Sequence, residues 1–99
     1  MKFILNFTPT AKQALIKDLK GSSNQKKQYK AVVKTLQFLS QNPRHPSLQT
    51  HLYHSVHGPN GEKIFEAYAE QNTSAAYRIF FYYGPHKGEI IIFAIISHP

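Results

Sequence analysis

The last quarter of the chain, AYRIFFYYGPHKGEIIIFAIISHP at residues 76–99, carries the pattern that decides the fold. Two runs rich in Ile, Phe and Tyr flank a Gly-Pro-His-Lys-Gly segment, which is typical of two antiparallel strands joined by a tight turn. Polar residues are rare in these strands. Arg78 and His98 are therefore the positions at which we look for chemistry.

The expected register of this strand pair places Arg78 and His98 together. With Tyr83 opposite Glu89, Arg78 lies opposite Ala94. Because side chains alternate between the two faces of a strand, Arg78 and His98 then project from the same face. A slip of one residue would separate them.

A preceding apolar run, KIFEAYA at residues 63–69, predicts a neighbouring strand. An even register would place Glu66 and Tyr68 on the face that carries Arg78. One face would then hold a carboxylate, a guanidinium, an imidazole and a phenol, which suit acid/base chemistry on a phosphodiester. Two plainer readings stay open: Arg78 forms only an ion pair with Glu66, and His98 is a solvated chain end.

The rest of the chain predicts one strand and two helices before these elements. KFILNF at residues 2–7 reads as a strand, and residues 9–20 and 25–41 each place apolar side chains on one helical face. Residues 42–61, with their Pro, Gly and His, read as a long connection. We expect a single α+β domain over residues 1–99, with two N-terminal helices packed on a mostly antiparallel four-stranded sheet.

The charge of the chain favours polyanionic partners. Twelve Lys and Arg residues against five acidic residues give a formal net charge of +7. Four of the lysines form a cationic band on the second predicted helix, where they either bind a polyanion or make an ordinary solvated helix face: Lys26, Lys27, Lys30 and Lys34. The chain has no cysteine and no apolar stretch of membrane-spanning length, so we expect a cytoplasmic protein without membrane partners.

Three histidines repeat at every third position in the connecting segment, at His51, His54 and His57. Zinc sites usually use Cys, carboxylates or a helical His pair four residues apart, so this spacing is a weak metal signal. We predict no metal and no cofactor, and a polar or phosphate-facing role for the segment.

The order of elements resembles that of the RelE/ParE superfamily of bacterial toxins. The stretches that carry the resemblance are NPRHPSL at residues 42–48, IFEAYAEQNTSAAYRIFFYY at residues 64–83, and IIIFAIISHP at residues 90–99. The resemblance covers nearly the whole chain. It implies a small toxin neutralised by an acidic antitoxin protein.

The RelE-like branch of the superfamily implies a ribosome-dependent mRNA endoribonuclease that uses the 2′-hydroxyl as nucleophile and needs no metal. By resemblance, Arg78 acts at the scissile phosphate, His98 as general acid or phosphate contact, and Glu66 as base. The lysine band would hold ribosomal RNA, and Tyr68, Tyr82 or Tyr83 would stack on a base. The alternatives are a ParE-like DNA gyrase inhibitor and a non-catalytic relative that only binds an antitoxin.

Overall fold

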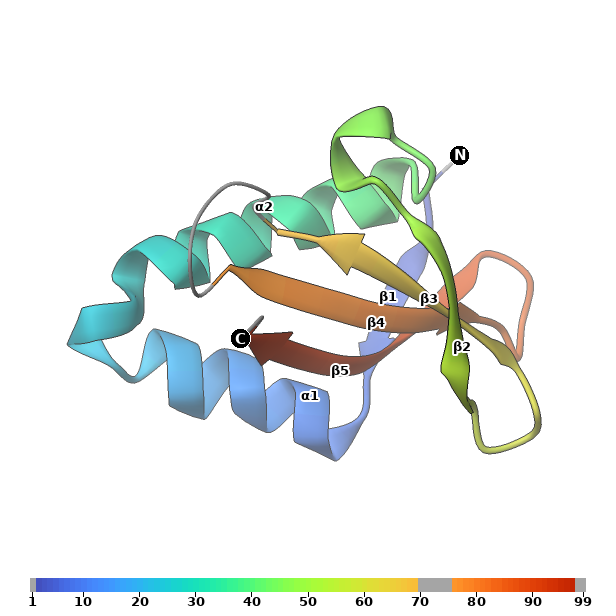
Figure 1. Ribbon diagram of the computed structural model, residues 1–99, viewed down its shortest axis with the longest axis horizontal. Coiled ribbons are helices and arrows are strands. Elements are labelled where there is room, and N and C mark those ends of the chain that lie inside the picture. The colour runs from blue at the N-terminus through green and yellow to red at the C-terminus, as the bar shows by residue number, and fades with distance from the viewer. Residues whose placement is uncertain (1, 70–75, 98–99) are drawn as a thin grey trace.

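A strand, a helical hairpin and four further strands follow one another along the chain (Figure 1). The computed structural model describes residues 2–69 and 76–97. In chain order the elements are β1 (Ile4–Phe7), α1 (Pro9–Gln13), the π-helical η1 (Ala14–Lys20), the short 3₁₀ turn η2 (Ser23–Gln25), α2 (Lys26–Gln41), the 3₁₀ turn η3 (Pro46–Leu48), β2 (His51–His57), β3 (Lys63–Tyr68), β4 (Tyr77–Tyr83) and β5 (Glu89–Ser97).

The first helical arm is fixed to the sheet at its start. The hydroxyl oxygen of Thr8 accepts a hydrogen bond from the Ala11 amide at 3.2 Å, which caps α1. The same hydroxyl donates to the Phe93 carbonyl of β5 at 2.9 Å. The single helix expected over residues 9–20 is present as α1 running on into η1, and Leu19 is fully buried near its end.

The second helix, α2, buries one stripe of side chains and exposes the opposite one. The Thr35 hydroxyl belongs to the buried stripe and donates to the Ala31 carbonyl at 2.8 Å, so it brings no unsatisfied group into the core. The buried residues are Val32, Thr35, Leu36 and Leu39. The exposed stripe carries the four lysines of the predicted cationic band.

The strands form one mixed sheet in the order β1-β5-β4-β3-β2. β1 is parallel to β5, and the other neighbouring pairs are antiparallel. The expected α+β architecture is confirmed, but the expected strand number is wrong because the sheet has five strands. Within residues 42–61, predicted as a connection, the chain forms the edge strand β2, which crosses the far end of β3 at a steep angle in Figure 1.

A β-bulge corrects the predicted register of β4 and β5. Phe80 lies opposite Ala94 and Phe81 opposite Ile92, so Phe93 has no partner. Arg78 consequently lies opposite Ile96, two residues from the predicted Ala94. Two residues are one full period of a strand, so Ala94 still shares the face of Arg78.

At the turn end of the same pair the shift is one residue, which reverses the faces. Tyr83 lies opposite Ile90 and not opposite Glu89. The predicted register would place Ile90 and Ile92 on the face of Arg78, but both are fully buried with Phe81 in the core beneath the helices.

The helices contribute to only one of the two clusters of buried residues. The main core joins helix residues such as Leu19 and Leu39 to Ile79 and Phe81 of β4. The opposite face of the sheet has its own smaller cluster, built only from strand residues around Ile64, Phe80 and Tyr82. Within residues 2–69 and 76–97, no helix therefore covers the face that carries Arg78.

Candidate functional site

An ion pair between Arg78 and Glu66 lies on the sheet face that has no helical cover. Glu66 is opposite Phe80, and Arg78 is opposite Tyr68, so the two charged residues are diagonal neighbours across β3 and β4. The Arg78 guanidinium donates from Nη1 to Glu66 Oε2 at 2.7 Å. The prediction that Glu66, Tyr68 and Arg78 share a face is confirmed. The ion pair between Arg78 and Glu66 is present, and whether Arg78 has a role beyond it stays a prediction.

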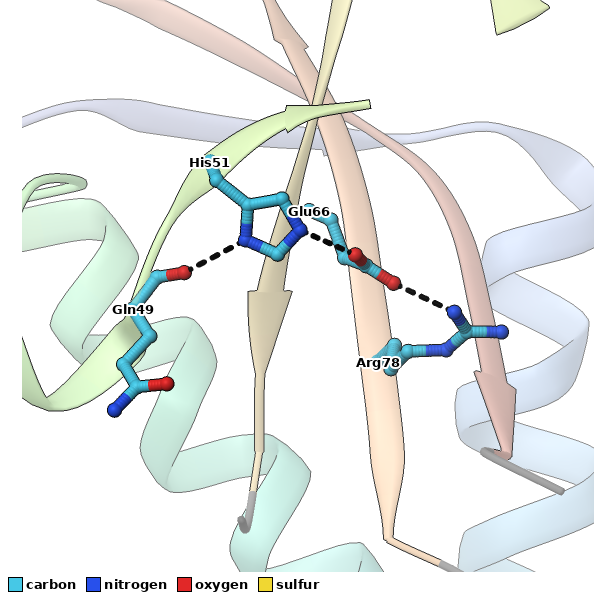
Figure 2. A network of polar contacts seen from close by, with 4 residues as sticks. All are labelled: Gln49, His51, Glu66 and Arg78. Atoms are coloured by element: carbon cyan, nitrogen blue, oxygen red, sulfur yellow. Dashed lines mark hydrogen bonds and ion pairs between the residues drawn. The ribbon is translucent and has the colours of Figure 1, made fainter. Parts of the chain in front are cut away.

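His51 is the third member of this group, which we call the charged row: His51, Glu66 and Arg78. His51 lies opposite Glu66 in the β2–β3 register, and its Nε2 is 2.7 Å from Glu66 Oε1. Figure 2 shows the three side chains in a line across β2, β3 and β4. Each carboxylate oxygen of Glu66 therefore has its own cationic or potentially cationic partner.

Both nitrogens of the His51 ring face hydrogen-bond acceptors. Its Nδ1 lies 3.0 Å from the Gln49 carbonyl oxygen, which can only accept a hydrogen bond. Its Nε2 faces a carboxylate oxygen of Glu66. Both ring nitrogens thus face acceptors, and both act as donors when the ring is an imidazolium.

A short irregular segment aims the Gln49 carbonyl at His51. Gln49 follows η3 and adopts the left-handed conformation, with φ of 46°. This conformation is costly for a residue with a Cβ, and it turns the chain sharply into β2. The resulting hydrogen bond, drawn in Figure 2, fixes the orientation of the imidazole before any ligand arrives.

The charged row buries its anion and exposes its cations. The side chain of Glu66 is 4% exposed, whereas those of Arg78 and His51 are 21% and 48% exposed. The Arg78 guanidinium also lies over the Phe80 ring, 5.3 Å from its centroid, and its buried Nε has no hydrogen-bond partner among the described residues. The row thus places a guanidinium and an imidazole, both able to donate a hydrogen bond to an anion, toward solvent and keeps its carboxylate buried.

Tyr68 adds a neutral phenol next to the row. Its ring centroid is 5.6 Å from that of His51. Burial raises the pKa of Tyr68, and the negative charge of Glu66 and a hydrogen bond to that carboxylate raise it further, against the opposing effect of Arg78. Tyr68 consequently keeps its proton as a hydrogen-bond donor at neutral pH.

The remaining predicted site residues divide into three groups. The α2 lysines Lys26, Lys27, Lys30 and Lys34 are exposed and lie outside the charged row. Tyr82 is only 7% exposed and packs against Phe93, so its ring cannot stack on a base without rearrangement, which argues against the predicted role. His98 lies outside the described residues.

A cavity of ≈ 430 Å³ lies at the β2 edge of the sheet. We call it the edge cavity, and its lining residues include Arg44, Gln49, His51, Phe65 and Tyr83. The sequence analysis identified neither this cavity nor the role of His51, because residues 42–61 were predicted as a connection. A useful signal was the run of residues 51–57, in which Leu52, Tyr53 and Val56 lie between the three histidines, a mixed apolar and polar pattern that an edge strand tolerates.

The described residues contain neither a metal-binding cluster nor a membrane-spanning helix. Over residues 2–69 and 76–97 there is no group of three or more His, Asp or Glu side chains arranged to hold a metal ion, and His51, His54 and His57 do not converge on one point. In the same part of the chain, no helix combines the length and the apolar character that crossing a membrane would need.

Comparison with known proteins places the fold. No protein-family model matches the sequence, and no curated protein gives a significant match. Among solved structures, the chain is similar to one from the archaeal RelE-RelB complex of Pyrococcus horikoshii OT3, with a TM-score of 0.65 and 13% sequence identity. The match covers 98% of this chain and 96% of that one. This chain has a RelE-like fold.

Proposed function

We propose that this protein is the toxin of a toxin-antitoxin pair and acts as a metal-independent endoribonuclease on mRNA in the ribosome. The observation that carries the proposal is the charged row on an uncovered sheet face of a RelE-like fold. Arg78 offers a positive charge, and His51 an imidazole that can donate a hydrogen bond, to a phosphodiester that binds on this face. The structural neighbour was solved as a RelE-RelB complex, which supports a partner protein for this chain as well.

The proposed reaction needs no group beyond the protein and the RNA. The 2′-hydroxyl oxygen attacks the adjacent phosphorus, the bond from phosphorus to the 5′-oxygen breaks, and a 2′,3′-cyclic phosphate and a 5′-hydroxyl result. Arg78 stabilises the charge on the phosphorane. Glu66 takes the proton of the 2′-hydroxyl, and His98 returns a proton to the 5′-oxygen.

The geometry sets a condition on the role of Glu66. Both of its carboxylate oxygens are occupied, by His51 and by Arg78. Proton abstraction by Glu66 therefore requires the substrate to displace one partner. His51 is the more exposed of the two, at 48% against 21%, so it is the partner that an incoming hydroxyl would replace.

The charge distribution supports the proposed partners. The exposed lysines of α2 offer contacts for ribosomal RNA phosphates, and the net charge of +7 suits an acidic antitoxin. We place the activity in the cytoplasm, where both ribosomes and mRNA are found.

One observation favours a second candidate function, a non-catalytic relative that binds only an antitoxin. Glu66 and Arg78 satisfy each other across the sheet, as a purely structural ion pair would. A gyrase inhibitor is the further alternative that the shared fold leaves open.

The deciding experiment is primer extension on an mRNA translated in a reconstituted system, with purified protein added at low salt. We expect cleavage within ribosome-bound codons. Arg78→Gln, which can still donate to Glu66, should abolish it, and Lys87→Gln, which removes an exposed positive charge elsewhere, should not. Thermal unfolding of each variant shows whether the fold is intact. Uncut mRNA with normal translation would overturn the nuclease proposal, and a parallel supercoiling assay would then test gyrase.

A further inference from the structure

We propose that the edge cavity binds one base of single-stranded RNA, adjoining the phosphate that Arg78 and His51 contact. This inference rests on the proposed function, because it takes RNA as the ligand of the charged row. The cavity volume of ≈ 430 Å³ lies within the range of ordinary ligand pockets.

Two aromatic residues, Phe65 and Tyr83, line the cavity. Their ring centroids are 5.4 Å apart in an edge-to-face arrangement. Both residues point to the helix-covered side of the sheet, where the Tyr83 ring also contacts Phe3 and Phe81. Tyr83 nevertheless remains 36% exposed, and the exposed part of this cavity-lining ring is what a base would contact.

The cavity lining also includes the polar side chains of Arg44 and Gln49. Arg44 is exposed, and its side chain makes no ion pair or hydrogen bond with the described residues. The side-chain amide of Gln49 points away from the charged row in Figure 2 and can both donate and accept. The Gln49 amide can form hydrogen bonds with the edge of a base, and the Arg44 guanidinium can bind a neighbouring phosphate.

Charge and position narrow the ligand class. Among the described residues that line the cavity, none is acidic and Arg44 is cationic, so this lining favours an anionic ligand. His51 lines the cavity and also donates to Glu66, so the cavity and the charged row adjoin each other. A nucleotide chain places a base next to each phosphate, and one strand can occupy both places at once.

The test uses isotope-labelled full-length protein and a 2′-O-methyl RNA trinucleotide, which lacks the attacking hydroxyl and cannot be cut. Titration followed by NMR should shift amide signals at residues 44–51, Phe65 and Tyr83 and give a dissociation constant. Tyr83→Leu should weaken binding by about 5-fold to about 150-fold, the equivalent of about 1–3 kcal/mol per stacked base. Tyr83→Phe, which keeps the ring, should bind as the unchanged protein does.

Two controls make the result specific. A trinucleotide with one abasic position should bind the unchanged protein and Tyr83→Leu equally, because the stacked base is gone. Arg44→Gln should weaken binding more than Lys87→Gln, which alters the net charge equally. Equal binding by Tyr83→Leu and the unchanged protein, or no binding by either, would overturn the inference. The probe cannot be cleaved, so its binding tests the base site independently of nuclease activity. If the protein cleaves mRNA but Tyr83→Leu binds the trinucleotide as tightly as the unchanged protein does, the proposed function stands and only the base site is contradicted.

Discussion

At the scale of single residues, Glu66 determines the arrangement of the charged row. It is the buried member, and its two oxygens orient one donor each from the strands on either side. Burying a carboxylate costs free energy, which hydrogen bonds to charged donors offset. Glu66 therefore holds Arg78 and His51 in position whether or not it also accepts a proton.

Replacing Glu66 tests this arrangement directly. Glu66→Gln leaves Arg78 a carbonyl acceptor but gives His51 an amide donor, which Nε2 can meet only as a hydrogen-bond acceptor. We expect a loss of about 1–3 kcal/mol in the free energy of unfolding, measured with urea. Nitrogen chemical shifts of the variant should show a ring that carries its proton on Nδ1 and accepts at Nε2.

The matched control for this variant is Asp18→Asn, which removes the same charge from an exposed side chain that has no ion pair among the described residues. We expect it to stay within about 0.5 kcal/mol of the unchanged protein. An equal effect from both variants would show that Glu66 has no special role in stability.

Tyr68 predicts a dependence of stability on alkaline pH. Its pKa is raised above the ordinary 10.0, chiefly by burial. Between the unfolded and the folded pKa, the folded protein therefore keeps the phenol proton while the unfolded chain has released it. This contribution is complete below about pH 10 and is lost as the pH rises through the folded pKa. The free energy of unfolding should therefore fall with pH above about 10, and less steeply in Tyr68→Phe. Identical slopes in urea titrations of the two proteins would contradict this.

At the scale of elements, the sequence predicted well where apolar periodicity is strong. The helix expected over residues 25–41 matches α2, and the strands containing Glu66 and Arg78 are present. β2 escaped prediction because an edge strand with polar residues on both faces lacks the alternation that marks a half-buried strand. With β2 unrecognised, neither the fifth strand nor the role of His51 could be derived.

The bulge in β5 escaped prediction for the opposite reason. IIIF and AII are apolar on both faces, so the pattern does not show which residues face the core. Phe93 has no partner in the ladder, and only the packing of Phe81, Ile90 and Ile92 beneath the helices fixes its position. Registers in uniformly apolar strands depend on such tertiary contacts.

Thr8 links an element boundary to the sheet, and its loss should be measurable. Thr8→Ala removes both the cap on α1 and the bond to the Phe93 carbonyl. We expect a loss of about 0.5–2 kcal/mol in urea denaturation, as for other N-cap residues. Thr10→Ala, in an exposed position of the same helix, should cause no comparable loss. Equal stability of the two variants would show that the Thr8 hydroxyl contributes nothing.

At the scale of the whole molecule, the exposed face of α2 carries a cluster of positive charges. The four α2 lysines face solvent together, on the side opposite the buried stripe of Val32 and Leu36. Such a band is either a solvated surface or a contact for RNA phosphates. Salt dependence separates the two, since each phosphate contact releases counterions.

Replacing Lys26, Lys27, Lys30 and Lys34 by Gln tests the band as a unit. For single-stranded RNA, each contact contributes about 0.7 to the slope of log affinity against log salt concentration, so the slope should fall by about 3. Replacing Lys12, Lys17, Lys20 and Lys87 by Gln changes the net charge equally and serves as the control. If both sets lower the slope by the same amount, the α2 band is only a solvated face.

The parallel pairing of β1 with β5 has a consequence for synthesis of the chain. β1 is made before the other described strands, but its only neighbour in the described sheet is β5, the last of them, and Asn6 lies 83 positions before its hydrogen-bonding partner Glu89. A nascent chain therefore carries an unpaired, partly apolar strand until residues 89–97 have left the ribosome. During translation β1 can join the sheet only after β5 has been made. Until then its unpaired backbone and apolar side chains are open to pairing with other chains.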